Sequence, residues 1–266
     1  CIRDSIRSLL LKFHIIKKIE KICNLISHRD RNRYTSAIIL AAGKSERMND
    51  KSLSKQLIEI DGIPVVIHSV LAFQKSEKIN EIIVVAAENE IPLYQNFRKK
   101  YSLSKLKFVV SGGASRAESA LRGFRKVSKE CGFIAIHDAA RCLITAEDID
   151  RIVLEAYRTG AAIAAKRATD TVKKADENGF VTETIDRSLL WLAQTPQVFK
   201  KSVYEVSVSS AEKIDEKITD DAMLAELAGF HVKLVECMNE NIKITNTSDL
   251  AIARDILMKR KTGGNA

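Results

Sequence analysis

Cysteine is scarce in this chain, and its arrangement excludes two structural classes. The five cysteines are an odd number, lie far apart and include no Cys-x-x-Cys pair. This spacing argues against a disulfide framework and against a zinc site built from paired cysteines. The five histidines form no His-Glu-x-x-His motif either, which excludes that kind of zinc site. We therefore expect a reducing, cytoplasmic environment.

Long apolar runs are absent as well. No stretch approaches the roughly 18 consecutive apolar residues that span a bilayer, so we expect no membrane-spanning segment. Hydrophobic residues nevertheless make up 45% of the 266 residues, a proportion typical of a globular protein. A chain of this length can bury one good core, with or without an appendage.

Basic charge is concentrated at one end of the chain. Residues 1–36 hold nine Lys or Arg and three Asp or Glu, so they contribute +6 of the net charge of +9. The remaining residues are close to neutral, and we therefore expect no nucleic-acid-binding face in the core.

We interpret residues 1–35 as a basic N-terminal extension without a role in the chemistry. A membrane-surface or partner helix, a targeting segment for a plastid-type organelle, and upstream sequence foreign to the native protein all remain open. Apolar residues recur in it at helical spacing, namely Leu11, Ile15, Ile19, Ile22 and Ile26.

Two common nucleotide-binding motifs are missing, and a different loop is present. The chain contains neither G-x-x-x-x-G-K-S/T nor G-x-G-x-x-G. Instead, the apolar run Ala37–Leu40 predicts a buried parallel strand. It is followed by Ala41, Ala42 and Gly43, which have almost no side chain. Small residues at this point let a flat ligand approach the backbone closely.

Cations follow these small residues. The next loop carries Lys44, Arg47, Lys51 and Lys55, and such side chains neutralise phosphate groups. The whole segment therefore predicts a nucleoside triphosphate site. An ordinary strand-turn of an α/β domain is the alternative.

From Ser36 onward, strand-like runs alternate with helical patterns. This order predicts an α/β fold, a Rossmann-like, mostly parallel sheet with helices on both faces, over residues 36–262. Ligands of such sheets bind beyond the carboxyl ends of the strands. The expected strands are Ala37–Leu40, Glu81–Ala86, Lys107–Val110, Phe133–His137 and Ala161–Ala165, and the expected helices lie near Pro64–Gln74, Ser115–Val127 and Ala146–Tyr157.

Residues 167–190 interrupt the alternation. Two strand-like runs, Asp170–Lys174 and Phe180–Ile185, flank a turn that ends in Asn178-Gly179, and Asn-Gly is a strong hairpin signal. Because a two-stranded hairpin is marginally stable by itself, we expect a protruding β-arm that packs on another subunit. We expect Trp191 to pack under this arm.

Several motifs in the rest of the chain are similar to those of a known family. They read Gly112-Gly113-Ala114-Ser115-Arg116, His137-Asp138-Ala139-Ala140-Arg141, Asp186-Arg187, Gln194-Thr195-Pro196-Gln197, Thr219-Asp220-Asp221-Ala222 and Asn241-Ile242-Lys243-Ile244-Thr245. With the first loop, and in this order, they resemble the 2-C-methyl-D-erythritol 4-phosphate cytidylyltransferase family of the isoprenoid pathway. The resemblance covers residues 36–258. It implies transfer of a cytidylyl group from CTP to 2-C-methyl-D-erythritol 4-phosphate, with release of pyrophosphate.

The resemblance also implies where CTP binds. The small residues of the first loop would lie against the nucleotide, and Gly113 and Ser119 would contact its base and ribose. Free backbone N–H groups at the start of a helix near Ser115 suit a ligand there. A glycine turn before a capped helix is the alternative.

Asp138 is the predicted metal ligand. It follows the apolar strand Phe133–Ile136, and a lone carboxylate there suits the Mg²⁺ of a triphosphate, because few protein carboxylates and several phosphate oxygens usually hold Mg²⁺. We therefore expect Mg²⁺ as the cofactor. A structural ion pair with Arg141 is the alternative for Asp138, and Glu240 is a weaker second candidate for the metal.

Arg47, Lys55 and Lys243 are the predicted catalytic cations. In the implied reaction a phosphate oxygen of the acceptor attacks the α-phosphorus of CTP. This nucleophile is already an anion, so no general base is required. The site instead has to hold two polyanions together and offset the charge that builds at the α-phosphate.

The acceptor site is predicted from the resemblance alone. It implies that Thr171 and Arg187, on the arm, hold the acceptor phosphate, and Thr195 is a further substrate-site candidate. In this family the arm reaches into the neighbouring subunit's site, which implies a homodimer with shared active sites.

Departures from the family pattern leave alternatives open. Ser54, Cys142 and Arg167 stand where the family has prolines, and loss of proline makes loops less rigid. The same chemistry on another polyol phosphate, such as ribitol 5-phosphate, is one alternative. A non-catalytic nucleotide- or nucleic-acid-binding protein that uses the basic N-terminus is another. A nicotinamide-dependent oxidoreductase is disfavoured by the missing glycine fingerprint.

Overall fold

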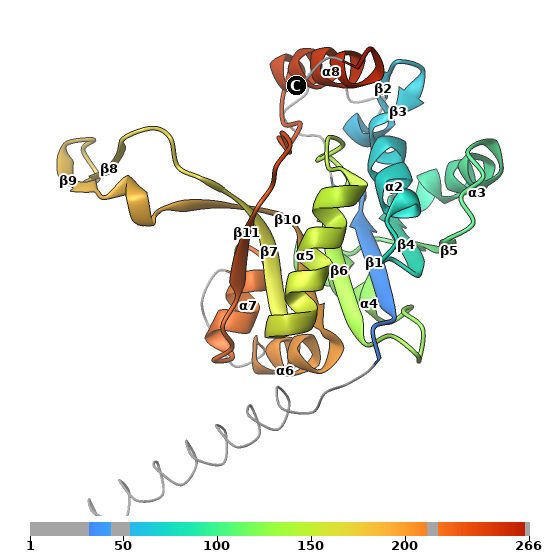
Figure 1. Ribbon diagram of the computed structural model, residues 1–266, viewed down its shortest axis with the longest axis horizontal. Coiled ribbons are helices and arrows are strands. Elements are labelled where there is room, and N and C mark those ends of the chain that lie inside the picture. The colour runs from blue at the N-terminus through green and yellow to red at the C-terminus, as the bar shows by residue number, and fades with distance from the viewer. Residues whose placement is uncertain (1–31, 44–53, 212–217, 264–266) are drawn as a thin grey trace, which may run out of the picture.

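Apolar segments from all parts of the chain meet in one sheet (Figure 1). The computed structural model describes residues 32–43, 54–211 and 218–263. Within these residues the main sheet has seven strands in the order β11-β7-β10-β6-β1-β4-β5. Only β10 runs against the others. The bounds are β1 Thr35–Leu40, β4 Glu81–Ala86, β5 Leu106–Ser111, β6 Phe133–Asp138, β7 Ala161–Arg167, β10 Trp191–Lys200 and β11 Lys233–Glu236.

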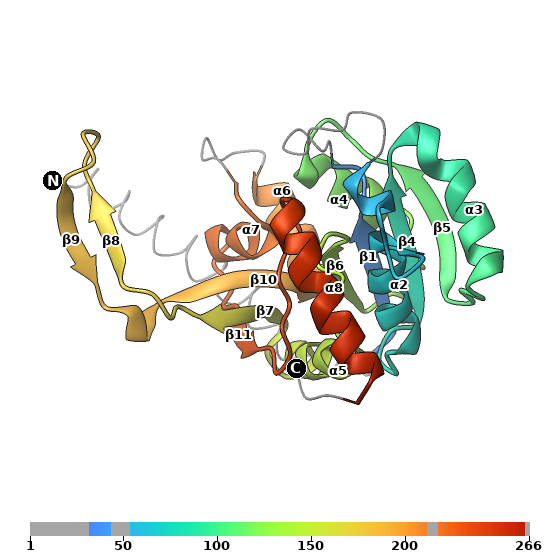
Figure 2. The same cartoon turned by 90° about the horizontal axis from the view of Figure 1, so that it is seen from above.

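Helices cover both faces of the sheet, as predicted (Figures 1 and 2). On one face, α2 (Val65–Lys75), α3 (Ile91–Lys100) and α5 (Ala146–Thr159) pack over an apolar cluster that includes Val84 and Ala135. On the other, α4 (Arg116–Phe124), α6 (Lys201–Ala211) and α7 (Asp221–Leu227) pack over Ile38 and Ile136. The central strands are buried on both sides, which is why they appear in the sequence as continuous apolar runs.

A third apolar cluster joins the last helix to the segment that follows β6. Helix α8 (Thr247–Lys261) packs Ala253 against Cys142, Leu143 and Ile244. The two-stranded sheet of β2 (Glu59–Ile60) and β3 (Ile63–Pro64) lies beside it, since Ile60 belongs to the same cluster. Three short 3-10 helices complete the described secondary structure, and they are η1 Lys55–Leu57, η2 Glu88–Glu90 and η3 Arg187–Leu189.

The predicted arm is a separate hairpin that projects from the main sheet (Figure 2). Strands β8 (Val172–Ala175) and β9 (Val181–Ile185) pair antiparallel, and Gly179 in their turn has φ of 86°, a conformation that glycine adopts without strain. At the base of the arm, the guanidinium carbon of Arg167 lies 4.3 Å from the centre of the Trp191 ring.

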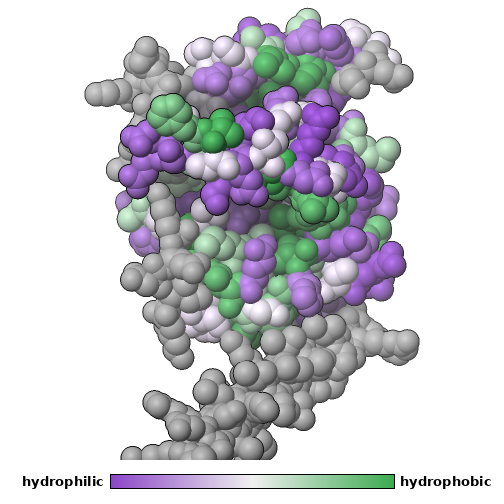
Figure 3. Space-filling model, turned by 90° about the vertical axis from the view of Figure 1, so that its left-hand side faces the viewer, coloured by the Kyte–Doolittle hydropathy of each residue, from purple (hydrophilic) through white to green (hydrophobic). Residues whose placement is uncertain are grey.

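The arm exposes apolar side chains. Phe180 is 73% exposed and Leu189 is 78% exposed, and apolar patches interrupt the hydrophilic surface on the side of the molecule from which the arm projects (Figure 3). The arm makes a two-stranded sheet of its own, apart from the main sheet.

Helix starts follow local capping signals in the sequence. Thr145 caps α5, because its side chain accepts a hydrogen bond from the N–H of Asp148. Ser115 caps α4 in the same way through the N–H of Glu118. The described helices include none that is both long and apolar enough to cross a membrane.

Candidate active site

Strands β1 and β6 end side by side and bring two predicted motifs together. Leu40 pairs with Asp138 in the parallel register, and the N–H of Ala139 donates to the carbonyl of Leu40 over 3.0 Å. The loop that begins at Ala41 therefore starts next to Asp138. This is the carboxyl edge of the sheet, where ligands of such folds bind.

The turn after β5 closes against the loop after β1. A Cβ atom at Gly112 would lie 2.2 Å from the Cβ of Ala42, so only glycine lets the two segments approach this closely. The N–H of Gly113 donates to the hydroxyl of Ser119 over 3.0 Å. The first loop and the start of α4 therefore form two adjoining walls.

These walls enclose a pocket of about 520 Å³ at the carboxyl edge. Lys55, Arg116 and Lys243 bring positive charge to it, and Asp138 is the carboxylate of its lining. The other lining residues are Leu40, Ala42, Gly43, Gln56, Gly113, Ala114, Ser115, Ser119 and Ala140.

Two cations hold the carboxylate of Asp138. Arg116 Nε lies 3.1 Å from Oδ1, and Lys243 Nζ lies 2.7 Å from Oδ2. Burial alone would raise the pKa of Asp138, but Arg116 and Lys243 hold this pKa well below its ordinary value. Arg141 donates to the carbonyl of Asn241 over 2.8 Å, so the ion-pair partners of Asp138 are different cations from the one that the sequence suggested.

Buried contacts place Lys243 at the pocket. Asn241 is 3% exposed, and its side-chain amide donates to the carbonyl of Thr195 over 2.9 Å. On the other side of Lys243, the N–H of Ile244 donates to the carbonyl of Ala140 over 2.8 Å. The segment is therefore fixed both to β10 and to the residues that follow β6.

His137 and Thr195 support Asp138 from behind. The N–H of Asp138 donates to Oγ1 of Thr195 over 3.0 Å, and this oxygen lies 3.1 Å from Nδ1 of His137. Nε2 of His137 lies 3.2 Å from the carbonyl of Arg141, which can only accept. Nε2 therefore carries the proton of the neutral ring, and the Thr195 hydroxyl donates to Nδ1.

Buried His137 is expected to make the protein less stable in acid. Burial lowers its pKa from 6.5 to about 3, so between these values the unfolded chain binds a proton that the folded chain does not. Stability falls as pH falls through this range, by about 2 to 3 kcal/mol between pH 6 and pH 4 from this residue. Urea unfolding of the wild type and of His137→Gln at several pH values checks this. The two stability curves should converge on acidification, and parallel curves would contradict the prediction.

The described structure brings together most of the nucleotide-site residues predicted from sequence. Ala42, Gly43, Lys55, Gly113, Ser119, Asp138 and Lys243 all line the pocket. Ala41 is buried beside it, where its N–H donates to the carbonyl of Val85. Arg47, together with Lys44 and Lys51, lies outside the described residues.

The predicted acceptor residues do not line this pocket within the chain. Thr171 and Arg187 lie on the arm, where Arg187 donates to the carbonyl of Thr169 over 2.6 Å. Thr195 is 4% exposed and lies behind Asp138. Glu240 pairs with Lys166 over 3.1 Å and does not line the pocket.

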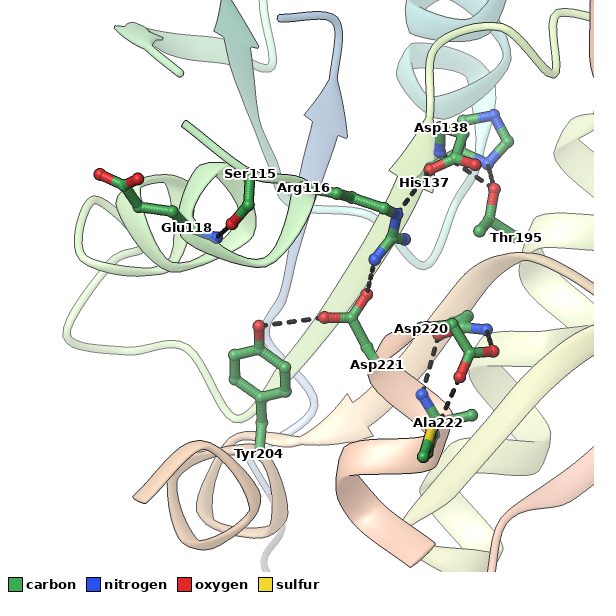
Figure 4. A network of polar contacts seen from close by, with 12 residues as sticks. Ser115, Arg116, Glu118, His137, Asp138, Thr195, Tyr204, Asp220, Asp221 and Ala222 are labelled. Atoms are coloured by element: carbon green, nitrogen blue, oxygen red, sulfur yellow. Dashed lines mark hydrogen bonds and ion pairs between the residues drawn. The ribbon is translucent and has the colours of Figure 1, made fainter. Parts of the chain in front are cut away.

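Two residues that sequence reasoning left without a role are central to the site. Arg116 bridges Asp138 and Asp221, and Figure 4 shows its guanidinium between the two carboxylates. Both residues stand in motifs that the sequence pointed out, but the motifs are far apart in the chain. Only the contact in space pairs them.

The donor set fits a cation that takes most of its ligands from elsewhere. Among the described residues, no three His, Cys, Asp or Glu side chains are grouped to hold a metal ion. A single carboxylate surrounded by Lys and Arg suits Mg²⁺, which keeps phosphate and water ligands, and does not suit a metal held by protein groups alone. The pocket therefore has the features of a nucleotidyltransferase: an α/β sheet, small-residue loops, and cations around one carboxylate.

Comparisons with known proteins identify the family. The family model described as IspD, 2-C-methyl-D-erythritol 4-phosphate cytidylyltransferase, matches residues 35–259. A protein of that name from Alkaliphilus metalliredigens is 41% identical over 229 residues, which are 86% of this chain and 95% of that protein. Another of that name, from Caldanaerobacter subterraneus subsp. tengcongensis, is 44% identical over 225 residues, 84% of this chain and 99% of that protein.

A solved structure agrees. The crystal structure of 4-diphosphocytidyl-2C-methyl-D-erythritol synthase from Anaerococcus prevotii matches with a TM-score of 0.76 at 26% identity, over 86% of this chain and 98% of that chain. The chain belongs to the 2-C-methyl-D-erythritol 4-phosphate cytidylyltransferase family. Membership confirms the predicted fold, the enzyme class and the reaction, which is transfer of a cytidylyl group from CTP to 2-C-methyl-D-erythritol 4-phosphate with release of pyrophosphate.

Proposed function

We propose that the pocket beside Asp138 binds CTP and is where the cytidylyl group is transferred. The observation that carries this proposal is the convergence of Lys55, Arg116 and Lys243 on a pocket that also holds one carboxylate. Three positive charges suit a triphosphate and the charge that builds at its α-phosphorus during attack. The acceptor phosphate is itself the nucleophile, so the site needs no proton acceptor.

We assign the residue roles from the family resemblance, and the position of Gly113, Ser119, Lys55 and Lys243 on the pocket wall supports them. Gly113 and Ser119 contact the base and ribose, and the small residues Ala41, Ala42 and Gly43 leave room for the nucleotide at the first loop. Lys55 and Lys243 stabilise the phosphates, together with Arg47 from the loop that follows Gly43. The fold that does this begins near residue 36, and residues 1–35 take no part in the chemistry.

We assign Asp138 as the protein ligand of Mg²⁺. Its position on the pocket wall between two cations supports this role, because a carboxylate there can face a metal–triphosphate complex. When bound, Mg²⁺ would offset the negative charge of the triphosphate. Asp138 itself orients Lys243 and Arg116, which lie on either side of it.

We propose that a second copy of the chain completes the site that binds the acceptor. Thr171 and Arg187 are on the arm and do not line the pocket of their own chain, while the arm exposes Phe180 and Leu189. Exposed apolar side chains on a projecting hairpin favour packing against a partner. A homodimer in which each arm brings Arg187 to the other pocket accounts for both features.

Arg187→Ala is expected to raise KM for the acceptor by about tenfold or more and to change KM for CTP less than twofold, because it removes a cation that holds only the acceptor phosphate. Lys173→Ala is the control, since Lys173 lies on the same arm and donates to the Thr184 hydroxyl over 2.7 Å. Steady-state kinetics with each substrate varied checks this. Equal changes in both KM values would contradict the placement of Arg187.

Mixed dimers decide whether the arm acts in its own site or in its neighbour's. In a dimer of one Arg187→Ala and one Lys243→Ala subunit, one site has an intact pocket and an intact arm only if arms are exchanged. Refolding the two variants together in equal amounts should then restore about one quarter of wild-type activity at low acceptor concentration. No recovery, with mixed dimers demonstrated, would mean that each arm serves its own subunit.

Pyrophosphate release with CTP and Mg²⁺ tests the acceptor directly. Methylerythritol 4-phosphate and ribitol 5-phosphate are offered in parallel, and turnover is expected with methylerythritol 4-phosphate. Turnover with ribitol 5-phosphate alone would contradict the proposed acceptor.

A further inference from the structure

Asp221 is a buried carboxylate just outside the pocket. It is the first residue of α7 and is 1% exposed. Its Oδ2 lies 2.6 Å from Nη1 of Arg116, and its Oδ1 accepts from the Tyr204 hydroxyl over 3.2 Å. The capping residue of α7 is Asp220, which accepts from the N–H of Met223 over 2.9 Å. Burial raises the pKa of Asp221 above its ordinary value, and the attraction of Arg116, 2.6 Å away, is the largest effect that opposes this and favours the charged form. The carboxylate of Asp221 is therefore directed mainly at Arg116 and is not needed as a cap.

Arg116 is shared between two carboxylates on different elements. It begins α4, and its guanidinium uses Nε toward Asp138 on β6 and Nη1 toward Asp221 on α7 (Figure 4). Burial by itself would lower the pKa of Arg116, but Asp221 and Asp138 raise this pKa above its ordinary value. The guanidinium therefore stays charged, and two contacts through two different nitrogens fix its plane.

Removing one of these contacts has a specific consequence for the other. A guanidinium free to turn prefers two parallel hydrogen bonds to one carboxylate. Without the charge of Asp221, Arg116 would turn a second nitrogen toward Asp138 and compete there with Lys243 and with any ligand of that carboxylate. Asp221 opposes this rotation, because it binds Nη1 of Arg116 at 2.6 Å. The contact between Nε of Arg116 and Asp138 is longer, at 3.1 Å.

We propose that Asp221 is a positioning residue that acts through Arg116, holding the guanidinium so that a single nitrogen reaches Asp138. Arg116 and Asp138 are then held in one fixed arrangement in the pocket, and CTP binds to that arrangement. Tyr204 secures Asp221 from the side away from the pocket. This inference deepens the proposed function and rests on it, because it assumes that CTP binds beside Asp138.

Asp221→Asn tests the proposal, since asparagine has nearly the same shape but lacks the charge. We expect kcat/KM for CTP to fall about 30-fold or more and the dissociation constant for CTP, measured by calorimetry without acceptor, to rise about tenfold. KM for the acceptor should change less than twofold. Asp221→Glu, which keeps the carboxylate, should recover part of the loss.

Tyr204→Phe is the matched control. It removes the other hydrogen bond to Asp221 but leaves the Asp221–Arg116 pair, so kcat/KM for CTP should stay within about threefold of wild type. Thermal unfolding of both variants separates loss of fold from loss of CTP binding. A loss of CTP binding as large in Tyr204→Phe as in Asp221→Asn would overturn the proposal, because it would assign the effect to packing around α7.

A second pair of variants tests whether Asp221 acts through Arg116. Adding Asp221→Asn to Arg116→Met should lower kcat/KM by less than a further twofold. If Asp221→Asn does not fold, Arg116→Met/Asp221→Leu replaces it, since an apolar pair avoids an unpaired buried charge. Wild-type CTP affinity in the Asp221 variant, or fully additive losses, would overturn the proposal. A wild-type protein that neither binds CTP nor turns it over would overturn the proposed function instead.

Discussion

Replacing Lys243 with alanine is expected to lower kcat by about 10³-fold while the fold survives. Lys243 lines the pocket and lies 2.7 Å from Asp138, so its loss removes one of the charges that would stabilise the phosphates in the transition state. Single groups of this kind contribute about 10²- to 10³-fold. The rate of pyrophosphate release at saturating CTP and acceptor is the measurement.

The stability of Lys243→Ala should be close to that of the wild type. The side chain of Lys243 is 40% exposed, and the buried carboxylate of Asp138 keeps its second partner, Arg116. The substitution therefore leaves no buried charge without an opposite charge beside it. Lys259→Ala is the control, because Lys259 pairs with Asp255 on the surface of α8 and should leave kcat within twofold. A kcat of Lys243→Ala within tenfold of wild type would remove Lys243 from the mechanism.

Asp138→Asn should also lower kcat by about 10³-fold, for a different reason. The pKa of Asp138 is held well below its ordinary value, so the group acts as a permanent charge and not as a proton donor. Asparagine keeps the shape and the backbone contact to Thr195 but loses the attraction for Lys243, Arg116 and a cation. Turnover measured over a range of Mg²⁺ concentrations should show a raised Mg²⁺ requirement as well as a lower maximum.

Asp61→Asn is the control for this variant. Asp61 forms an ion pair with Lys261 over 2.6 Å near the surface and does not line the pocket, so its loss should leave both kcat and the Mg²⁺ requirement unchanged. If Asp138→Asn kept the wild-type Mg²⁺ requirement while kcat fell, Asp138 would orient the two cations without binding metal. An unchanged kcat would exclude it from the site.

The strands that the sequence predicted best are those buried on both faces. The sequence predicts Glu81–Ala86 with the same bounds as β4, because a parallel strand covered on both faces is a nearly continuous apolar run, which here follows Glu81. Strand β10 was not predicted, although its residues were singled out as a motif. Gln194, Thr195 and Gln197 break its apolar pattern. Gln197 is only 1% exposed, and its side-chain amide is satisfied by a hydrogen bond that it donates to Asp220.

The arm shows a different limit. Asn178-Gly179 predicts a hairpin from two residues alone, because the turn depends on local backbone conformation. Nothing local shows that Thr171 and Arg187 lie away from the pocket of their own chain. Their distance from it depends on the path of the chain from β7 through the arm to β10.

By itself, the sequence determined the alternation of strands and helices, the hairpin and the family, because each of these depends on neighbouring residues or on motifs in order. The sequence also pointed to Asp138 and Lys243 separately. Only the tertiary structure decided that they touch, although 105 positions separate them, and that Arg116 joins Asp138 to the buried Asp221. Such contacts depend on where β6, α4 and α7 end in space, and side-chain pairing across elements leaves no periodic pattern in the chain.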